Sequence, residues 1–251
     1  MKPNFSPEIT RLRSHSDYDT EVGRDAPKYS TATPATDTMT DHLRQSALGN
    51  VYYRIMQNTL LPWIQDSGIT PNQMTLIGVL AALGVPLGFY LHPTLGWILI
   101  VISGIADSLD GLLARRAAKC TIFGAFLDSS LDRLSDCFYL IGFWSLFLHQ
   151  PGQVTATLIV FTALLFTFLI SYVKARAESL GAACGTGLME RGVRVVYLIA
   201  WALALVVFGV PKIVLWGGLL VYWILTLATV VQRIRHVRQK LQTTSAGCSP
   251  V

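Results

Sequence analysis

The sequence predicts an all-α integral membrane protein with six transmembrane helices and an N-terminal amphipathic juxtamembrane helix. Composition is the first reason: of the 251 residues, 52% are hydrophobic and only 14% are charged, and the mean hydropathy is +0.46. These values are far from those of an average soluble globular protein. The second reason is the placement of charges, because long apolar stretches without Asp, Glu, Lys or Arg alternate with short charged segments.

The first 65 residues precede the predicted spans and divide into two parts. Residues 1–40 are rich in Ser, Thr, Asp and Pro without hydrophobic periodicity, which predicts a disordered cytoplasmic tail. Residues 41–65 mix apolar with polar side chains. This mixture is typical of an amphipathic helix in the headgroup region, and an ordinary cytosolic helix packed on the bundle fits it equally well. We expect the membrane domain over 41–240 and a flexible C-terminal tail over 241–251.

Three apolar regions are each too long for a single crossing of the membrane. Asp66 and Asp107 bracket the first region, Asp136 and Lys174 bracket the second, and the third covers residues 195–231. About 20 apolar residues cross the ~30 Å hydrocarbon core. Each region should therefore fold as a hairpin of two helices.

Turn-forming residues mark the expected break within each hairpin. The breaks are His92-Pro93, residues 149–152 (His-Gln-Pro-Gly) and residues 209–212 (Gly-Val-Pro-Lys). The expected spans are 72–91, 95–117, 124–148, 153–179, 191–208 and 213–234.

The basic residues alternate between the two sides of the predicted membrane protein. The N-terminal segment, the loops after the second and fourth spans, and the C-terminal tail hold nearly all Lys and Arg, while the other loops hold only Lys212. By the positive-inside rule, the chain is a multi-pass protein of the cell (inner) membrane with both termini cytoplasmic. The net charge of +5 is thus distributed by membrane side, which disfavours nucleic acid as a partner.

Four aspartates lie on the second and third expected spans with helical spacing. Asp107 and Asp110 are three residues apart, and Asp128 and Asp132 are four apart. Each pair therefore projects from one helix face. Because a short loop joins the two spans, they should be antiparallel neighbours that bring both faces together.

Such a cluster of carboxylates requires a positive charge between its members. Carboxylate oxygens without His or thiolate suit Mg²⁺ or Mn²⁺ better than zinc, and a site for two metal ions follows naturally. The alternative is that the aspartates face water at the interface or pair with nearby cations. Ionisable groups at membrane depth cost at least ~2.5–3.5 kcal/mol each, which disfavours that alternative. The cations in question are Arg115, Arg116, Lys119 and Arg133.

The segment from residue 107 to 132 reads D-x-x-D-G-x-x-A-R, eight residues, G-x-x-x-D-x-x-x-D. It resembles, position by position, the signature of the CDP-alcohol phosphatidyltransferase family, and the similarity extends over about residues 70–233. The resemblance implies a six-helix fold, usually a homodimer, with an active site open to the cytoplasmic leaflet. It also implies transfer of a phosphatidyl group from CDP-diacylglycerol to an alcohol, with release of CMP.

The resemblance implies a role for each matching residue. Asp107, Asp110 and Asp128 would bind metal, two Mg²⁺ (or Mn²⁺) ions per site, and Asp132 would be the general base and also touch the second metal. Gly111 would let the backbone approach the nucleotide, and Arg115 would hold the diphosphate. The full set expected at the CDP moiety is Thr70, Pro71, Asn72, Gln73, Gly111, Ala114, Arg115, Thr121 and Gly124. Independently of the resemblance, Thr70 and Pro71 have the residue types of a helix cap and its first position.

A second group of cations lies at the expected cytoplasmic ends of the last three spans. These cations could anchor the helices at the membrane surface, or bind an acceptor that carries a phosphate, because Arg forms forked hydrogen bonds with phosphate oxygens. Three segments, S-Y-V-K-A-R-A-E, E-R-x-x-R and a late Q-R pair, resemble those of bacterial phosphatidylinositol phosphate synthases. The chain departs from that pattern at Gly192-Val193, where the family often has polar residues. By that resemblance the acceptor is 1D-myo-inositol 3-phosphate, and its phosphate is bound by Lys174, Arg176, Arg191, Arg194 and Arg233. Glycerol 3-phosphate is the competing acceptor within the same reaction class.

A cation or proton transporter is the alternative from another class, because acidic residues inside a helical bundle can line an ion path. The charge distribution disfavours it. The carboxylates gather on one cytoplasmic-side pair of helices, and the outer halves of the expected spans lack charges that would continue a path.

Overall fold

The computed structural model describes the helical part of the chain. The described residues are 54, 56, 58, 62, 64, 67–116, 121–148, 150–185 and 187–246, and they belong to the compact unit Met39–Val251. The predicted tail 1–40, most of the predicted amphipathic segment 41–65 and residues 247–251 lie outside them. The juxtamembrane helix and the domain limits therefore stay predictions.

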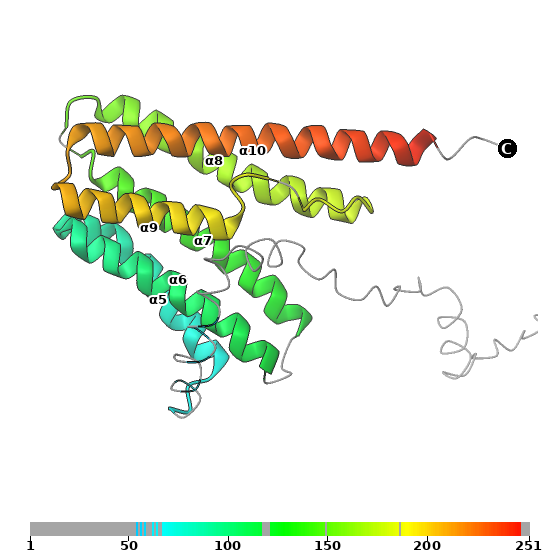
Figure 1. Cartoon of the computed structure of the whole chain (residues 1–251), viewed down its shortest axis with the longest axis horizontal. Helices are drawn as coiled ribbons and strands as arrows, with labels where there is room; N and C mark the ends of the chain where they lie inside the picture. The colour runs from blue at the N-terminus through cyan, green and yellow to red at the C-terminus, as the bar shows by residue number, and fades with distance from the viewer. Residues whose placement is uncertain are drawn as a thin grey trace, which may run out of the picture. The chain divides into compact units, whose positions relative to one another are not determined.

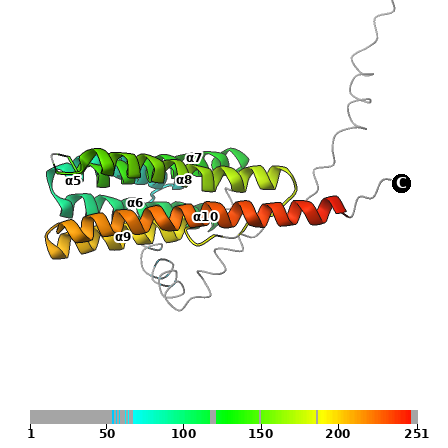
Figure 2. The same cartoon turned by 90° about the horizontal axis from the view of Figure 1, so that it is seen from above.

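The predicted all-α class is confirmed for the described residues, which form six long helices (Figures 1 and 2). Their limits lie close to the expected spans, except that the last helix continues well beyond residue 234. The helices are α5 (Pro71–Leu91), α6 (Pro93–Arg116), α7 (Ile122–Ser145), α8 (Gln153–Ser179), α9 (Arg191–Phe208) and α10 (Lys212–Ala246).

Among the described helices, five are long and apolar enough to cross a membrane: α5, α6, α8, α9 and α10. Helix α7 has a similar length of 24 residues, but it carries Asp128, Asp132, Arg133 and Asp136. Charged side chains in a lipid-embedded helix are costly and are kept where they face the protein interior or water. The charged residues that make α7 less apolar than the other helices thus include Asp128 and Asp132, two of the candidate site residues.

Within each predicted hairpin a short connection joins the two helices: residue 92 between α5 and α6, residues 146–152 between α7 and α8, and residues 209–211 between α9 and α10. His92 ends α5 with an extended backbone immediately before Pro93, and Gly209 ends α9 in the left-handed region at φ 73°. Consecutive helices are therefore antiparallel, so α5, α7 and α9 begin at the end of the bundle where α6 and α8 finish. We call this end, with the part of α10 from Thr229 onward, the polar end.

Aromatic side chains fill the bundle at the end opposite the polar end. Phe143 stacks on Trp201 with ring centroids 4.0 Å apart and planes 3° apart, and it contacts Phe89 at 4.8 Å. Phe147 meets Trp216 edge to face at 5.1 Å. These contacts join α5, α7, α9 and α10 into one core. Outward, large apolar side chains such as Leu87 (62% exposed) and Phe161 (64%) cover the surface, as expected for contact with lipid.

Helix α10 is 35 residues long, because its last turns pack against the loop that follows α8. Val237 and Leu241 contact a small cluster of Ala177, Ala182 and Cys184. The sixth span was expected to end at residue 234, and the helix continues beyond that limit. Val237 and Leu241 are four residues apart and partly buried, so this stretch has one apolar face that packs on the protein.

Candidate metal centre and active site

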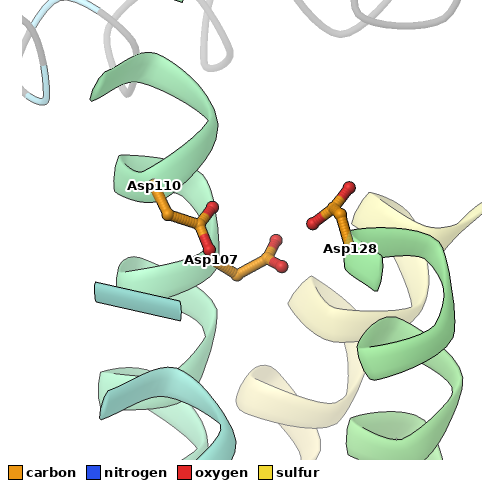
Figure 3. A group of neighbouring side chains, drawn as sticks. All are labelled: Asp107, Asp110 and Asp128. Atoms are coloured by element: carbon orange, nitrogen blue, oxygen red, sulfur yellow. The ribbon is translucent and has the colours of Figure 1, made fainter. Parts of the chain in front are cut away.

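Three aspartates meet between α6 and α7 at the polar end. Asp107, Asp110 and Asp128 each offer one carboxylate oxygen, and these oxygens all lie within 4.8 Å of one another. Figure 3 shows Asp107 and Asp110 on one helix facing Asp128 on the next. Oxygens gathered so closely, with no His or Cys among them, form a donor set suited to a hard divalent cation. The predicted convergence of these three carboxylates is therefore present in the structure.

The start of α7 sets the position of Asp128. Thr121 is the N-cap of this helix, and its hydroxyl oxygen accepts a hydrogen bond of 2.9 Å from the Gly124 backbone N–H. A Cβ atom at position 124 would lie only 2.9 Å from the Thr121 Oγ1. Glycine at 124 thus leaves room for the cap, which fixes where α7 begins.

Thr75 of α5 holds one of the three aspartates in place. Its hydroxyl lies 2.7 Å from Asp110 Oδ2 and 3.1 Å from the Pro71 carbonyl oxygen. The sequence did not predict this contact, because Thr75 is separated from Asp110 by 35 residues. One feature of the sequence could have indicated the contact: Thr75 has a hydroxyl and lies one helical turn after Pro71, next to the segment expected at the nucleotide.

Asp132 lies outside the group of three and pairs with a cation from α9. The Arg191 guanidinium contacts both oxygens of Asp107, at 2.6 and 2.7 Å, and Asp132 Oδ1 at 2.7 Å. The side chains of Arg191 and Asp132 are 30% and 17% exposed. Arg191, which was expected to bind the acceptor phosphate, thus contacts Asp107, expected to bind metal, and Asp132, expected to be the general base.

Other predicted site cations lie at different depths of the polar end. Arg194 is buried and pairs with Asp136 at 2.6 Å. Arg233 is also buried, donates to the Ile170 carbonyl at 2.7 Å and lies 3.9 Å from Glu190. Lys174 is half-buried and Arg176 is exposed, both near the end of α8. Arg133 was not a predicted site residue but a possible ion-pair partner of the aspartates, and its guanidinium donates to the Ser129 carbonyl of its own helix.

The residues expected at the CDP moiety come from three places in the sequence: the start of α5, the last turns of α6 and the start of α7. Thr70 caps α5 in a reciprocal capping box with Gln73, and Pro71 is the first residue of the helix, which confirms the predicted helix start. Asn72 is exposed beside them. Around Gly111 a Cβ atom would meet nothing within 4 Å, so its backbone is open to a ligand. The side chains of Ala114 and Arg115 lie outside the described residues.

A small pocket lies among the four aspartates, between α5, α6 and α7. Its floor includes Ser103, whose hydroxyl donates to the Gly78 carbonyl at 2.7 Å and receives a hydrogen bond of 2.7 Å from the Tyr139 hydroxyl. This buried chain links α5, α6 and α7 beneath the carboxylates. The lining residues are Thr75, Gly78, Val79, Ser103, Asp107, Asp110, Asp128, Leu131, Asp132 and Ser135.

The sequence matches a known family across the region that builds this site. The family model described as CDP-alcohol phosphatidyltransferase matches residues 68–232, which include α5 to α9 and most of α10. The chain belongs to the CDP-alcohol phosphatidyltransferase family. The expected family is therefore confirmed, and with it the class of enzyme.

Two curated proteins are similar to this chain over most of their own length. A phosphatidylinositol phosphate synthase of Mycolicibacterium smegmatis is 39% identical over 182 residues, covering 68% of this chain and 79% of the relative. An archaetidylinositol phosphate synthase of Pyrococcus horikoshii is 35% identical over 177 residues, covering 70% of this chain and 87% of the relative.

A solved structure agrees in fold with this CDP-alcohol phosphatidyltransferase. The phosphatidylinositol phosphate synthase of Mycobacterium tuberculosis with CDP-DAG bound gives a TM-score of 0.58 at 27% identity, covering 71% of this chain and 91% of the other. The same enzyme has also been solved in complex with manganese and citrate. Together with the three gathered aspartates, this likeness supports divalent metal binding by the chain, which has several apolar helices suited to a multi-pass membrane protein.

Proposed function

We propose that the chain transfers the phosphatidyl group of CDP-diacylglycerol to 1D-myo-inositol 3-phosphate, giving phosphatidylinositol phosphate and CMP. The single observation that carries the choice of a phosphorylated acceptor is the position of Arg191. Its guanidinium touches both Asp107 and Asp132, at 2.6–2.7 Å. A phosphate bound by this guanidinium would bring the acceptor next to the carboxylates that perform the chemistry.

The relatives support inositol phosphate as the acceptor. The curated names differ in the lipid, which is phosphatidyl in one relative and archaetidyl in the other, but both contain inositol phosphate. We take the phosphatidyl donor because the solved relative has CDP-DAG bound.

The metal-binding part of the proposal rests on the fit of the donor set. Asp107, Asp110 and Asp128 present three carboxylate oxygens within 4.8 Å of one another, which suits Mg²⁺ or Mn²⁺. We propose two ions per site, with Asp132 completing the set. Divalent cations held by these carboxylates would neutralise the diphosphate and stabilise the negative charge on the leaving CMP.

The protein side chains supply binding, orientation and a proton acceptor. Thr70, Pro71, Asn72, Gln73, Gly111, Ala114, Arg115, Thr121 and Gly124 are proposed to surround the CDP moiety. Asp132 accepts the proton of the acceptor hydroxyl as its oxygen forms a bond to the phosphorus that carries the lipid. The bond between that phosphorus and the CMP oxygen breaks, and CMP leaves with the electron pair.

The acceptor phosphate is proposed to bind at the cations of the polar end. Arg191 is the member adjacent to the carboxylates, while Lys174, Arg176 and Arg233 come from α8 and α10. Because α8, α9 and α10 bring these residues to the same end of the bundle, a doubly charged phosphate entering there meets several donors.

We also propose that all six helices cross the inner membrane, with both termini cytoplasmic and with a homodimer as the assembled form. The alternating placement of Lys and Arg supports the orientation. Asp132 and Asp136 of α7 point at arginines of α9. They support the inclusion of α7 among the six spans, because charged side chains in a membrane are retained where they serve a site. The homodimer rests on the family resemblance.

The test is a product assay with one acceptor at a time. Purified protein is incubated with CDP-diacylglycerol and Mg²⁺ or Mn²⁺, and inositol phosphate, free inositol, glycerol 3-phosphate or serine is added separately. We expect phosphatidylinositol phosphate, identified by mass spectrometry, only with inositol phosphate. Phosphatidylglycerophosphate or phosphatidylserine as the sole product would overturn the acceptor, and no CMP release with any acceptor would favour a transport or scaffold role.

A further inference from the structure

Two ion pairs connect α7 to α9, and the proposed function uses only one of them. Asp132 pairs with Arg191 at 2.7 Å, and one turn deeper Asp136 pairs with Arg194 at 2.6 Å. The aspartates are four residues apart on α7 and the arginines three apart on α9. Residues with these spacings lie on one helix face, so both pairs belong to a single line of contact between the two helices.

The two pairs differ in their surroundings. The outer pair is partly open, whereas the side chains of Arg194 and Asp136 are only 4% and 3% exposed. Both terminal nitrogens of Arg194 are engaged, one by Asp136 and the other by the Met189 carbonyl at 3.0 Å. The Arg194 guanidinium is thus directed at the protein rather than at the pocket.

Arg194 fixes the start of α9 as well as its contact with α7. Met189 lies two residues before Arg191, and its backbone N–H donates to Thr229 Oγ1 of α10 at 3.0 Å. The contacts of Arg194 therefore join α7, the residues leading into α9 and, through Met189, α10. Arg191 is one turn away on the same helix and takes its position from this junction.

We propose that Asp136 and Arg194 are a positioning pair that sets the register of α9 against α7 and thereby places the Arg191 guanidinium at Asp107 and Asp132. This differs from the sequence expectation, in which Arg194 binds the acceptor phosphate itself. The expected change in the KM for inositol phosphate rests on the proposed function. The expected change in the register of α9 against α7 does not.

Stability alone is a weak reason for this pair. Removing two charges from water is expensive, and a buried ion pair is often no more stabilising than apolar side chains of similar volume. Here Asp136 Oδ1 and Arg194 Nε are both buried without a hydrogen-bond partner, which adds to the cost. The pair supplies a directional bond between α7 and α9. Apolar packing would not supply such a bond.

The experiment is a cycle of three variants, Asp136→Leu, Arg194→Met and the double substitution. Two properties are measured for each: the KM for inositol phosphate, and the distance between spin labels on α7 and α9. The labels replace Phe123 and Val196, which are 69% and 66% exposed, in a background whose native cysteines are alanine. Arg235→Met, which removes an exposed arginine, is the control for the loss of one positive charge.

Each single substitution leaves one buried charge without its partner. We expect a broadened distance distribution and a KM for inositol phosphate raised roughly tenfold or more. The kcat and the KM for CDP-diacylglycerol should change less than about threefold. The control should match the wild type in both properties.

The double variant keeps the proposal testable if a single variant does not fold, because it buries no charge. The proposal requires the KM to follow the distance distribution in every variant that folds. A KM raised about tenfold at the wild-type distance would identify Arg194 as a direct ligand of the acceptor and overturn it. A broadened distribution with wild-type KM would overturn it equally. If the wild type itself used no phosphorylated acceptor, the proposed function would fail, whereas the distance measurement would still report the register.

Discussion

The two ends of the helical bundle are held together by different forces. At one end, apolar and aromatic side chains such as Phe89, Phe143 and Trp201 pack into a closed core. At the polar end, the helices meet through carboxylates, guanidinium groups and hydroxyls, among them Asp107, Arg191 and Thr75.

This difference separates the scaffold from the site. Close packing at the aromatic end requires no particular ligand, and in lipid it stabilises the bundle mainly through van der Waals contact. Charges at the polar end are stable only when paired, and the same groups can pair with metal, phosphate or one another. Substitutions at the polar end should therefore change chemistry and binding, and substitutions at the aromatic end should change stability.

The largest effect is expected from Asp132→Asn at the polar end. The amide cannot accept the proton of the acceptor hydroxyl, so turnover should fall by roughly 10²–10⁴-fold, while the affinity for CDP-diacylglycerol changes less than about twofold. Steady-state assays and equilibrium donor binding measure the two quantities. Normal turnover in the purified variant would refute the role of Asp132 as the base.

The next effect is expected from Arg191→Gln. Removing one partner from a close charge pair and from the proposed phosphate site should raise the KM for inositol phosphate by about 30-fold or more. The KM for CDP-diacylglycerol should remain near its wild-type value. Arg235→Gln is the matched control, and an equal rise in both KM values would show that Arg191 is not specific to the acceptor.

A smaller effect is expected from Thr75→Val, which removes the hydroxyl 2.7 Å from Asp110 with little change of shape. Groups that orient metal ligands commonly contribute about tenfold or more to metal affinity. We expect Mn²⁺ binding, followed by electron paramagnetic resonance, to weaken about tenfold. Thr75→Ser keeps the hydroxyl and should bind Mn²⁺ like the wild type. An equal loss of Mn²⁺ affinity in both variants would show that the hydroxyl does not orient Asp110.

The smallest effect on activity is expected at the aromatic end, from Phe143→Leu. Loss of the stacking on Trp201 should lower the free energy of unfolding by about 0.5–1.5 kcal/mol. Thermal unfolding in detergent should detect this as a lower Tm, with both KM values within about twofold of the wild type. A changed KM for either substrate would show that the two ends are not independent.

Much of the fold was predictable because neighbouring residues in the sequence indicate where a membrane helix begins and ends. The absence of charges over residues 67–106 and 137–173 and the turn residues between spans located the helices to within a few residues. The end of α10 was missed because its continuation is held by Val237 and Leu241 packing on Ala177 and Ala182. That contact joins residues about 55–65 positions apart and has no local signal.

The site was predictable where its residues share one motif. The spacing of Asp107, Asp110 and Asp128 was sufficient to expect their convergence, which the structure contains. Thr75, Asp136 and Tyr139 were not found, because their partners come from other helices. The roles of the predicted CDP and acceptor residues remain predictions.

The sequence by itself determined that the chain is helical, suited to membrane, and a carrier of clustered carboxylates, because helix periodicity and charge spacing act over neighbouring residues. Only the tertiary structure decided which cation meets which carboxylate. Arg191 and Arg194 are three residues apart with the same chemistry, yet one contacts Asp107 and Asp132 while the other is buried against Asp136. Their difference depends on how α9 packs against α6 and α7, which no spacing within a single helix encodes.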